Sequence, residues 1–198
     1  MPPGTTGHCA PTLRAAVTGL PSYVPGRRSA GTDIAALASN ESHYEPLPAA
    51  TAAVVAAAGA MNRYPDMAAV ELRERIARHL GVTAEEVAVG PGSVGVLQQI
   101  TTGLCNAGDE VIFAWRSFEA YPILVELAGA RPVRVPLDHL EGHDLDAMAA
   151  AVTDRTRVIL LCTPNNPTGV PISHDRLEAF VRSACGHAPG AAADRCHL

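Results

Sequence analysis

The sequence contains no lysine, because all fifteen basic side chains among its 198 residues are arginines. A guanidinium stays protonated and cannot condense with a carbonyl group, whereas a desolvated lysine amine can. The absence of lysine therefore excludes covalent chemistry that needs a Schiff-base lysine supplied by this chain. Together with the many alanines, it indicates a GC-rich coding sequence.

Other features are scarce as well. No apolar run reaches the ~18–20 residues that span a bilayer, and the N-terminus lacks a signal-peptide pattern, so we expect a cytoplasmic protein without a membrane partner. The net charge is −5 with no basic stripe, which argues against nucleic acid. Five irregularly spaced cysteines predict no disulfide framework. His139 and His143 have metal-like spacing, but Gly142 between them indicates a loop, so no metal site is predicted.

The apolar pattern divides the chain into three parts. Residues 1–48 are rich in proline, glycine and serine, which is typical of an extended arm, and residues 49–60 are alanine-rich and predict a helix. Together they form a predicted N-terminal arm segment over 1–65. Residues 66–182 alternate between strand and helix patterns, which predicts an α/β domain with a mostly parallel sheet. Residues 183–198 show no apolar period and no helix cap. They predict a non-native tail, from truncation or a shifted reading frame, and an ordinary disordered terminus is the alternative.

The individual elements follow from caps and spacing. Asp66 is a good N-cap and Gly81 a good helix end, so a helix is predicted between them. Asp109 and Glu110 are interpreted as a solvated turn before a strand. Strands are predicted over 87–89, 110–115, 132–136 and 157–162, and further helices from Ser93, over 117–128 and 144–152, and from about Ser173. In parallel sheets of this kind ligands bind beyond the carboxyl ends of the strands.

Two motifs lie at such strand ends. Gly90-Pro91-Gly92-Ser93 joins a predicted strand to a helix, where glycines and free N–H groups favour a phosphate. The same stretch matches the dinucleotide fingerprint Gly90-x-Gly92-x-x-Gly95, with Glu119 at the distance expected for a ribose contact. A Rossmann-type dinucleotide-binding protein is therefore an alternative, although about 90 residues precede the motif.

The second motif is T-P-N-N-P-T-G over 163–169, directly after the apolar strand R-V-I-L-L-C. Two prolines and a glycine hold a rigid loop that continues neither a strand nor a helix. An asparagine amide fixed in such a loop can donate a hydrogen bond to a ligand oxygen.

P-N-N-P-T-G after an apolar strand resembles the fold-type I aminotransferases. N-R-Y-P-D over 62–66 and W-R-S-F-E-A-Y over 115–121 are similar to the histidinol-phosphate aminotransferase family, especially its aromatic-amino-acid (phenylalanine) branch. The resemblance covers roughly residues 12–182, about the first half of such an enzyme. It implies an incomplete three-layer α/β/α large domain with a mostly parallel sheet, preceded by an arm (1–65) that belongs to the small domain and the dimer contact.

The resemblance also implies pyridoxal 5'-phosphate (PLP) as the cofactor and assigns residues to it. The amides of Gly92, Ser93 and Val94 would hold the phosphate, Phe118 would stack on the ring, Asn166 would bond its phenolic oxygen, and Tyr64 would reach the phosphate of a neighbouring subunit. Tyr23 and Asn40 would lie at the substrate pocket. For Tyr121 we favour core packing.

The implied reaction transfers an amino group between an aromatic amino acid, or histidinol phosphate, and a 2-oxo acid in a homodimer. Two departures stand out. N-E-S-H-Y-E over 40–45 replaces the family's N-E-N-P-Y-G, which leaves the substrate open. The family's D-E-x-Y and S-K segments, with the pyridinium-binding aspartate and the Schiff-base lysine, do not occur. No catalytic residue is therefore assigned, and the chain alone is predicted to be inactive. A non-catalytic fragment is a further alternative.

Overall fold

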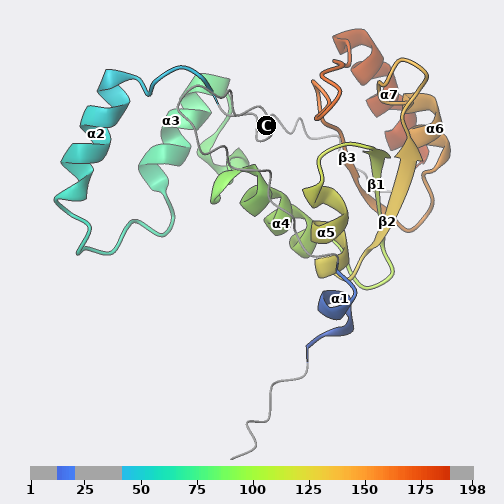
Figure 1. Cartoon of the computed structure of the whole chain (residues 1–198), viewed down its shortest axis with the longest axis horizontal. Coiled ribbons are helices and arrows are strands. Elements are labelled where there is room, and N and C mark those ends of the chain that lie inside the picture. Colours follow the sequence, from blue (N-terminus) through green and yellow to red (C-terminus); the bar gives the residue numbers. More distant parts are fainter. Residues whose placement is uncertain (1–12, 21–41, 188–198) are drawn as a thin grey trace, which may run out of the picture. The chain divides into compact units, whose positions relative to one another are not determined.

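The computed structural model describes residues 13–20 and 42–187, which form two compact units (Figure 1). One unit contains residues 13–20 and 90–187, and the other contains residues 42–89. Residues 66–89, which the sequence assigned to the large domain, thus group with residues 42–65. The boundary after residue 65 stays a prediction for the complete protein. Among the described residues, no helix is long and apolar enough to cross a membrane.

The first unit is built on a three-stranded sheet. Its strands are β1 (Glu110–Trp115), β2 (Arg131–Pro136) and β3 (Thr156–Leu160), in the spatial order β2-β1-β3. Both neighbours pair with β1 in parallel, with Ile112 opposite Val133 and Ile159. The predicted parallel sheet is confirmed.

Helices cover both faces of this sheet (Figure 1). They are α4 (Gly92–Leu104), α5 (Ala120–Leu127), α6 (Leu145–Ala150) and α7 (His174–His187), with a one-turn helix α1 (Ala15–Thr18) in the predicted arm. Alternate β1 side chains enter two separate cores, because successive side chains of a strand point to opposite faces. Val111 and Phe113 pack with residues of α4 and α5, whereas Ile112 and Ala114 pack with residues of α6 and α7. The three-layer α/β/α arrangement is confirmed.

A buried carboxylate joins the amino ends of the three strands. Glu110 is fully buried at the start of β1, so its interpretation as part of a solvated turn is wrong. Its carboxylate accepts hydrogen bonds from Arg131, from Thr153 at 2.8 Å and from Arg155 at 3.0 Å. Burial is tolerated because these donors replace water. The hydrogen bond from Arg131, helped by the other two, lowers the pKa of Glu110 to about 2.

The second unit contains α2 (Pro48–Ala58), α3 (Val70–Leu80) and the short 3-10 helix η1 (Ala84–Glu86). Asp66 acts as a cap, since its carboxylate accepts the N–H groups of Ala68 at 3.0 Å and Val70 at 2.8 Å. The helix nevertheless begins three residues later than predicted, because Ala69 has a positive φ of 46°. Gly81, with φ 71°, ends α3 as expected.

Two further expectations are wrong. Residues 87–89 are extended but pair with no strand among the described residues, and the carbonyl of Val87 instead accepts Arg73 Nε at 2.9 Å. At the other end, α7 continues to His187, past Arg182 where the sequence placed the end of the packed fold. Ala184 is buried in the core beside α6, so packing extends into the predicted tail.

Candidate functional site

The loops that follow the three strands are joined to one another at the carboxyl edge of the sheet. From the loop after β3, Asn165 Nδ2 donates to the carbonyl of Arg116, in the loop after β1, at 3.2 Å. Thr168 Oγ1 donates to the carbonyl of Glu141, in the loop after β2, at 2.8 Å. The sequence motif over 163–169 therefore lies at the carboxyl edge, where ligands of parallel sheets bind, and is bonded to both other loops.

The two asparagines of the motif have opposite environments. Asn166 is half-buried, and its side chain makes no hydrogen bond within the described part of the chain. Its amide is thus available to a ligand, as the predicted role requires. Asn165 is only 2% exposed and uses its amide inside the protein. Sequence reasoning assigned nothing to Asn165, because only the fold distinguishes it from its neighbour.

Phe118 lies in the loop after β1 and packs against the core that contains α4 and α5. Its ring meets that of Tyr121 edge-on, with centroids 5.6 Å apart and planes at 89°. Such a contact is favourable and fixes the direction of the Phe118 ring. Tyr121 itself is 3% exposed, so its predicted role in core packing is confirmed. Burial raises the pKa of Tyr121 well above its usual range, with a further contribution from Cys162.

The glycine turn opens α4, which begins at Gly92 without a side-chain cap. The Gly92 N–H donates to the carbonyl of Gly90 at 2.8 Å, so one of the three amides assigned to the phosphate is already engaged. Ser93 and Val94 follow in the first turn, where amides have no acceptor within the helix. An anion fits these two amides and the positive end of the helix dipole.

Three buried side-chain atoms in the described residues have no hydrogen-bond partner: Ser117 Oγ, His143 Nδ1 and Asn165 Oδ1. Each belongs to a different loop at the carboxyl edge. Burial lowers the pKa of His143, which favours a neutral ring, and its Nε2 accepts the Cys162 N–H at 3.4 Å. Buried polar groups are normally paired, so these three atoms make the carboxyl edge a candidate binding site.

Other predicted residues lie elsewhere. Tyr64 belongs to the second unit and is 99% exposed. Tyr23 and Asn40 lie outside the described residues. In the described ranges, no group of three histidine, cysteine or acidic side chains could hold a metal.

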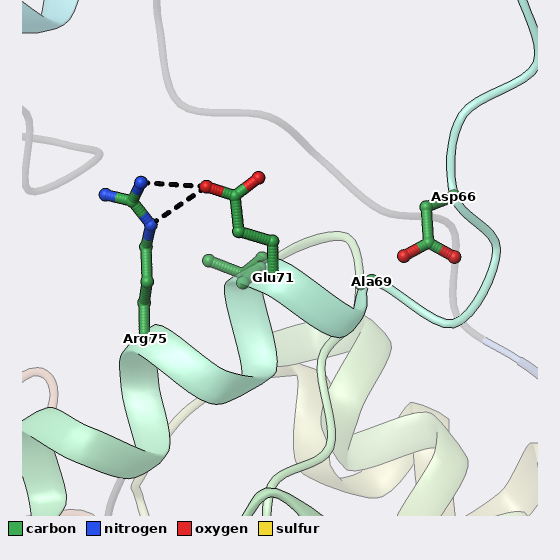
Figure 2. Close-up of a pocket in the computed structure, with 5 residues that line it drawn as sticks. Asp66, Ala69, Glu71 and Arg75 are labelled. Atoms are coloured by element: carbon green, nitrogen blue, oxygen red, sulfur yellow. Dashed lines mark hydrogen bonds and ion pairs between the residues drawn. The ribbon is translucent and has the colours of Figure 1, made fainter.

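A shallow hollow beside the start of α3 contains none of the predicted site residues (Figure 2). Glu71 and Arg75 form an ion pair across it at 2.7 Å, and Asp66 bonds the backbone. Its charged side chains therefore already have partners. The lining residues are Asp66, Ala69, Glu71, Leu72 and Arg75.

Comparison with known sequences establishes the family. The model of the class I and II aminotransferases matches residues 32–188, and the chain belongs to this family. It is 53% identical to an aromatic amino acid aminotransferase of Corynebacterium glutamicum over 169 aligned residues. These residues cover 85% of this chain and 49% of the relative. It is 51% identical over 174 residues to one from Streptomyces coelicolor, covering 87% and 48%. The chain thus spans about half the length of the curated relatives it matches.

Solved structures agree with this assignment. A histidinol-phosphate aminotransferase from Sinorhizobium meliloti in complex with pyridoxal-5'-phosphate superposes with a TM-score of 0.74 at 29% identity, over 86% of this chain and 47% of that chain. A Thermus thermophilus aspartate aminotransferase tetra mutant gives 0.73 at 28% identity, over 89% and 48%. The predicted aminotransferase fold and the resemblance are both confirmed.

Proposed function

We propose that this chain carries the cofactor-binding half of a PLP-dependent aminotransferase that moves an amino group between an aromatic amino acid and a 2-oxo acid. The proposal rests on the carboxyl edge of the sheet, where Asn165 joins the loop after β3 to the loop that bears Phe118. The neighbouring Asn166 amide makes no hydrogen bond within the described residues. Relatives about half identical to the chain are named aromatic amino acid aminotransferases, which supports the aromatic substrate. Histidinol phosphate is the alternative amino donor.

The described residues fit the cofactor in three ways. The Ser93 and Val94 amides would bind the phosphate, the Phe118 ring would orient the pyridine ring, and the Asn166 amide would donate to the phenolic oxygen. When bound, PLP supplies an electron sink for the bonds at the substrate's α-carbon. The side chains on this chain hold and orient the cofactor, and none supplies the amine that anchors it.

The cofactor assignment is tested with Trp115, the single tryptophan, which ends β1. Titration of the chain with PLP is expected to quench Trp115 emission in a saturable way, and Asn166→Ala is expected to weaken binding. A parallel titration with NAD decides the alternative. Saturable binding of NAD, with none of PLP, would instead support the dinucleotide-binding reading of the glycine turn.

The chain by itself is expected to have negligible activity. Loss of a positioned acid–base group costs about 10²–10⁴-fold in rate, and here the covalent anchor is absent too. The measurement is an amino-donor assay on the purified chain with phenylalanine, tyrosine or histidinol phosphate and a 2-oxo acid. Robust turnover would contradict this prediction, whereas the donor preference of a full-length protein that carries these residues decides the substrate.

The proposal includes a homodimer. All residues of α2 are exposed in the described unit, and Tyr64 is 99% exposed. A second copy would cover α2 and would receive Tyr64 near its phosphate site.

A further inference from the structure

We propose that Asn165 is a positioning residue that locks the loop after β3 onto the loop after β1. The lock fixes the relative placement of Asn166 and Phe118. Its consequence for PLP binding rests on the function proposed above, whereas the coupling between the two loops is a property of the chain itself.

Four hydrogen bonds converge on Asn165. Its Nδ2 donates to the carbonyl of Arg116 at 3.2 Å and to Thr168 Oγ1 at 3.0 Å. Its backbone N–H donates to the carbonyl of Val170 at 2.9 Å, and its own carbonyl accepts the Gly169 N–H at 2.6 Å. The backbone bonds close the loop on itself, whereas the side-chain amide connects it to the loop after β1.

The Asn165 side chain is buried, and its Nδ2 donates only to other protein groups among the described residues. Asn165 is 2% exposed, and both donor contacts of Nδ2 are satisfied within the protein. The bond to the Arg116 carbonyl is part-buried, and a substitution that removes its donor breaks this link between the two loops. The Arg116 carbonyl would therefore be left without this donor, two residues before Phe118.

Thr168 extends the same connection to the third loop. Its hydroxyl accepts from Asn165 Nδ2 and donates to the carbonyl of Glu141 at 2.8 Å. The loops after β1, β2 and β3 are thus linked through one asparagine amide and one threonine hydroxyl. Asn166, next in sequence, is left out of this network and keeps its amide for the cofactor.

The pair Asn165 and Asn166 provides a matched experiment. Asn165→Asp keeps the side-chain volume but replaces the donor with an acceptor that faces the Arg116 carbonyl. Hydrogen exchange of the cofactor-free chain, followed by mass spectrometry, is expected to become about tenfold faster in both 115–121 and 163–172. Asn166→Asp makes the same chemical change one residue away and is expected to leave exchange in both segments unchanged.

The segments in which hydrogen exchange becomes faster test whether Asn165 couples the two loops. Faster exchange confined to 163–172 in Asn165→Asp, or no change in either segment, would overturn the coupling. Thr168→Val is expected to loosen 137–144 as well as 163–172. For PLP binding, read from Trp115 emission, both asparagine variants should weaken affinity, but only Asn165→Asp should do so together with loosened loops. If the unchanged chain shows no PLP affinity, the proposed function fails, and the exchange data still test the coupling.

A measurement on the unchanged chain covers the case in which Asn165→Asp does not fold. The side-chain amide protons of Asn165 are expected to exchange with water at least about tenfold more slowly than those of Asn166 in NMR spectra. Equal exchange rates for the two side chains would refute the lock without any substitution.

Discussion

Gly95 occupies the first turn of α4, where the ring of Pro91 leaves no room for a side chain. A Cβ atom at this position would lie 2.6 Å from Pro91 Cδ and 2.7 Å from Pro91 Cγ. Gly95→Ala is therefore expected to destabilise the chain by about 1–3 kcal/mol, as overpacking does. It should also shift the turn that carries the Ser93 and Val94 amides and weaken PLP binding. Urea unfolding and the Trp115 titration measure the two effects.

Gly103 is the matched control because it lies in the same helix with nothing within 4 Å of its added Cβ. Gly103→Ala is expected to be neutral or to stabilise by about 0.4–1 kcal/mol, since alanine loses less backbone entropy on folding. Equal unfolding midpoints for the two variants would show that the Pro91 contact is not rigid.

Among the elements, the sheet is held at its amino edge by Glu110 and at its carboxyl edge by the loops. Glu110 is buried under arginines that start or precede the neighbouring strands, and its pKa is lowered to about 2. A carboxyl whose pKa is depressed by folding stabilises the protein above its unfolded pKa, and this contribution is lost as the pH falls through the folded pKa. The contribution should therefore be complete above about pH 4.5 and disappear as the pH approaches 2.

Glu110→Gln tests this connection between the strands. The substitution keeps the shape but removes the charge, so we expect a loss of about 1–3 kcal/mol at pH 7. The loss should shrink as the pH falls from about 4.5 toward 2, where the carboxyl becomes protonated in the unchanged chain as well. Urea unfolding across this pH range is the measurement.

Glu71→Gln removes a carboxylate of the same kind that is 79% exposed in its ion pair with Arg75 (Figure 2). An exposed pair contributes little, so we expect a change below about 0.5 kcal/mol. A loss as large as that of Glu110→Gln would mean that burial is not the cause.

The sequence predicted elements whose signals are local. Strand β1 has the bounds expected from its apolar run, and α3 ends at Gly81 as its cap indicates. Predictions from the sequence failed where the structure of a segment depends on residues distant along the chain. Residues 87–89 match a strand pattern but form no strand in the described structure. Glu110 matches a solvated turn, although Arg131 at the start of β2 and Arg155 just before β3 pair with its buried carboxylate.

In the candidate site too, local features were predicted from the sequence, whereas features that depend on distant residues were not. The motif over 163–169 and the glycine turn were predicted from composition and from their places after predicted strands, although residues 87–89 before the glycine turn form no strand. The assignment of Asn166 came from the resemblance, and its unpaired amide agrees with that role. Asn165 was missed, because two adjacent asparagines carry identical sequence signals and only the loop after β1 determines which amide becomes buried. Likewise, only the backbone shows that the Gly92 amide is engaged.

At the scale of the whole molecule, the two units differ in how far their apolar side chains are buried. The sheet of the first unit buries both faces under helices. In the second unit, α2 is almost entirely apolar, yet none of its residues is buried. Helices that are apolar all round are usually buried against another element. In the dimer proposed above, a second copy would cover α2.

Val55, 68% exposed on α2, provides the test. If α2 packs against a second copy, Val55→Glu places a charge in that contact and should shift sedimentation toward the monomer. The stability of the monomer should change by no more than about 0.5 kcal/mol, because the site is exposed within the chain. Leu140→Glu makes the same kind of change at a side chain that is also 68% exposed but lies in the loop after β2. Association should survive Leu140→Glu, and a dimer that is equally insensitive to Val55→Glu would show that another surface holds it together.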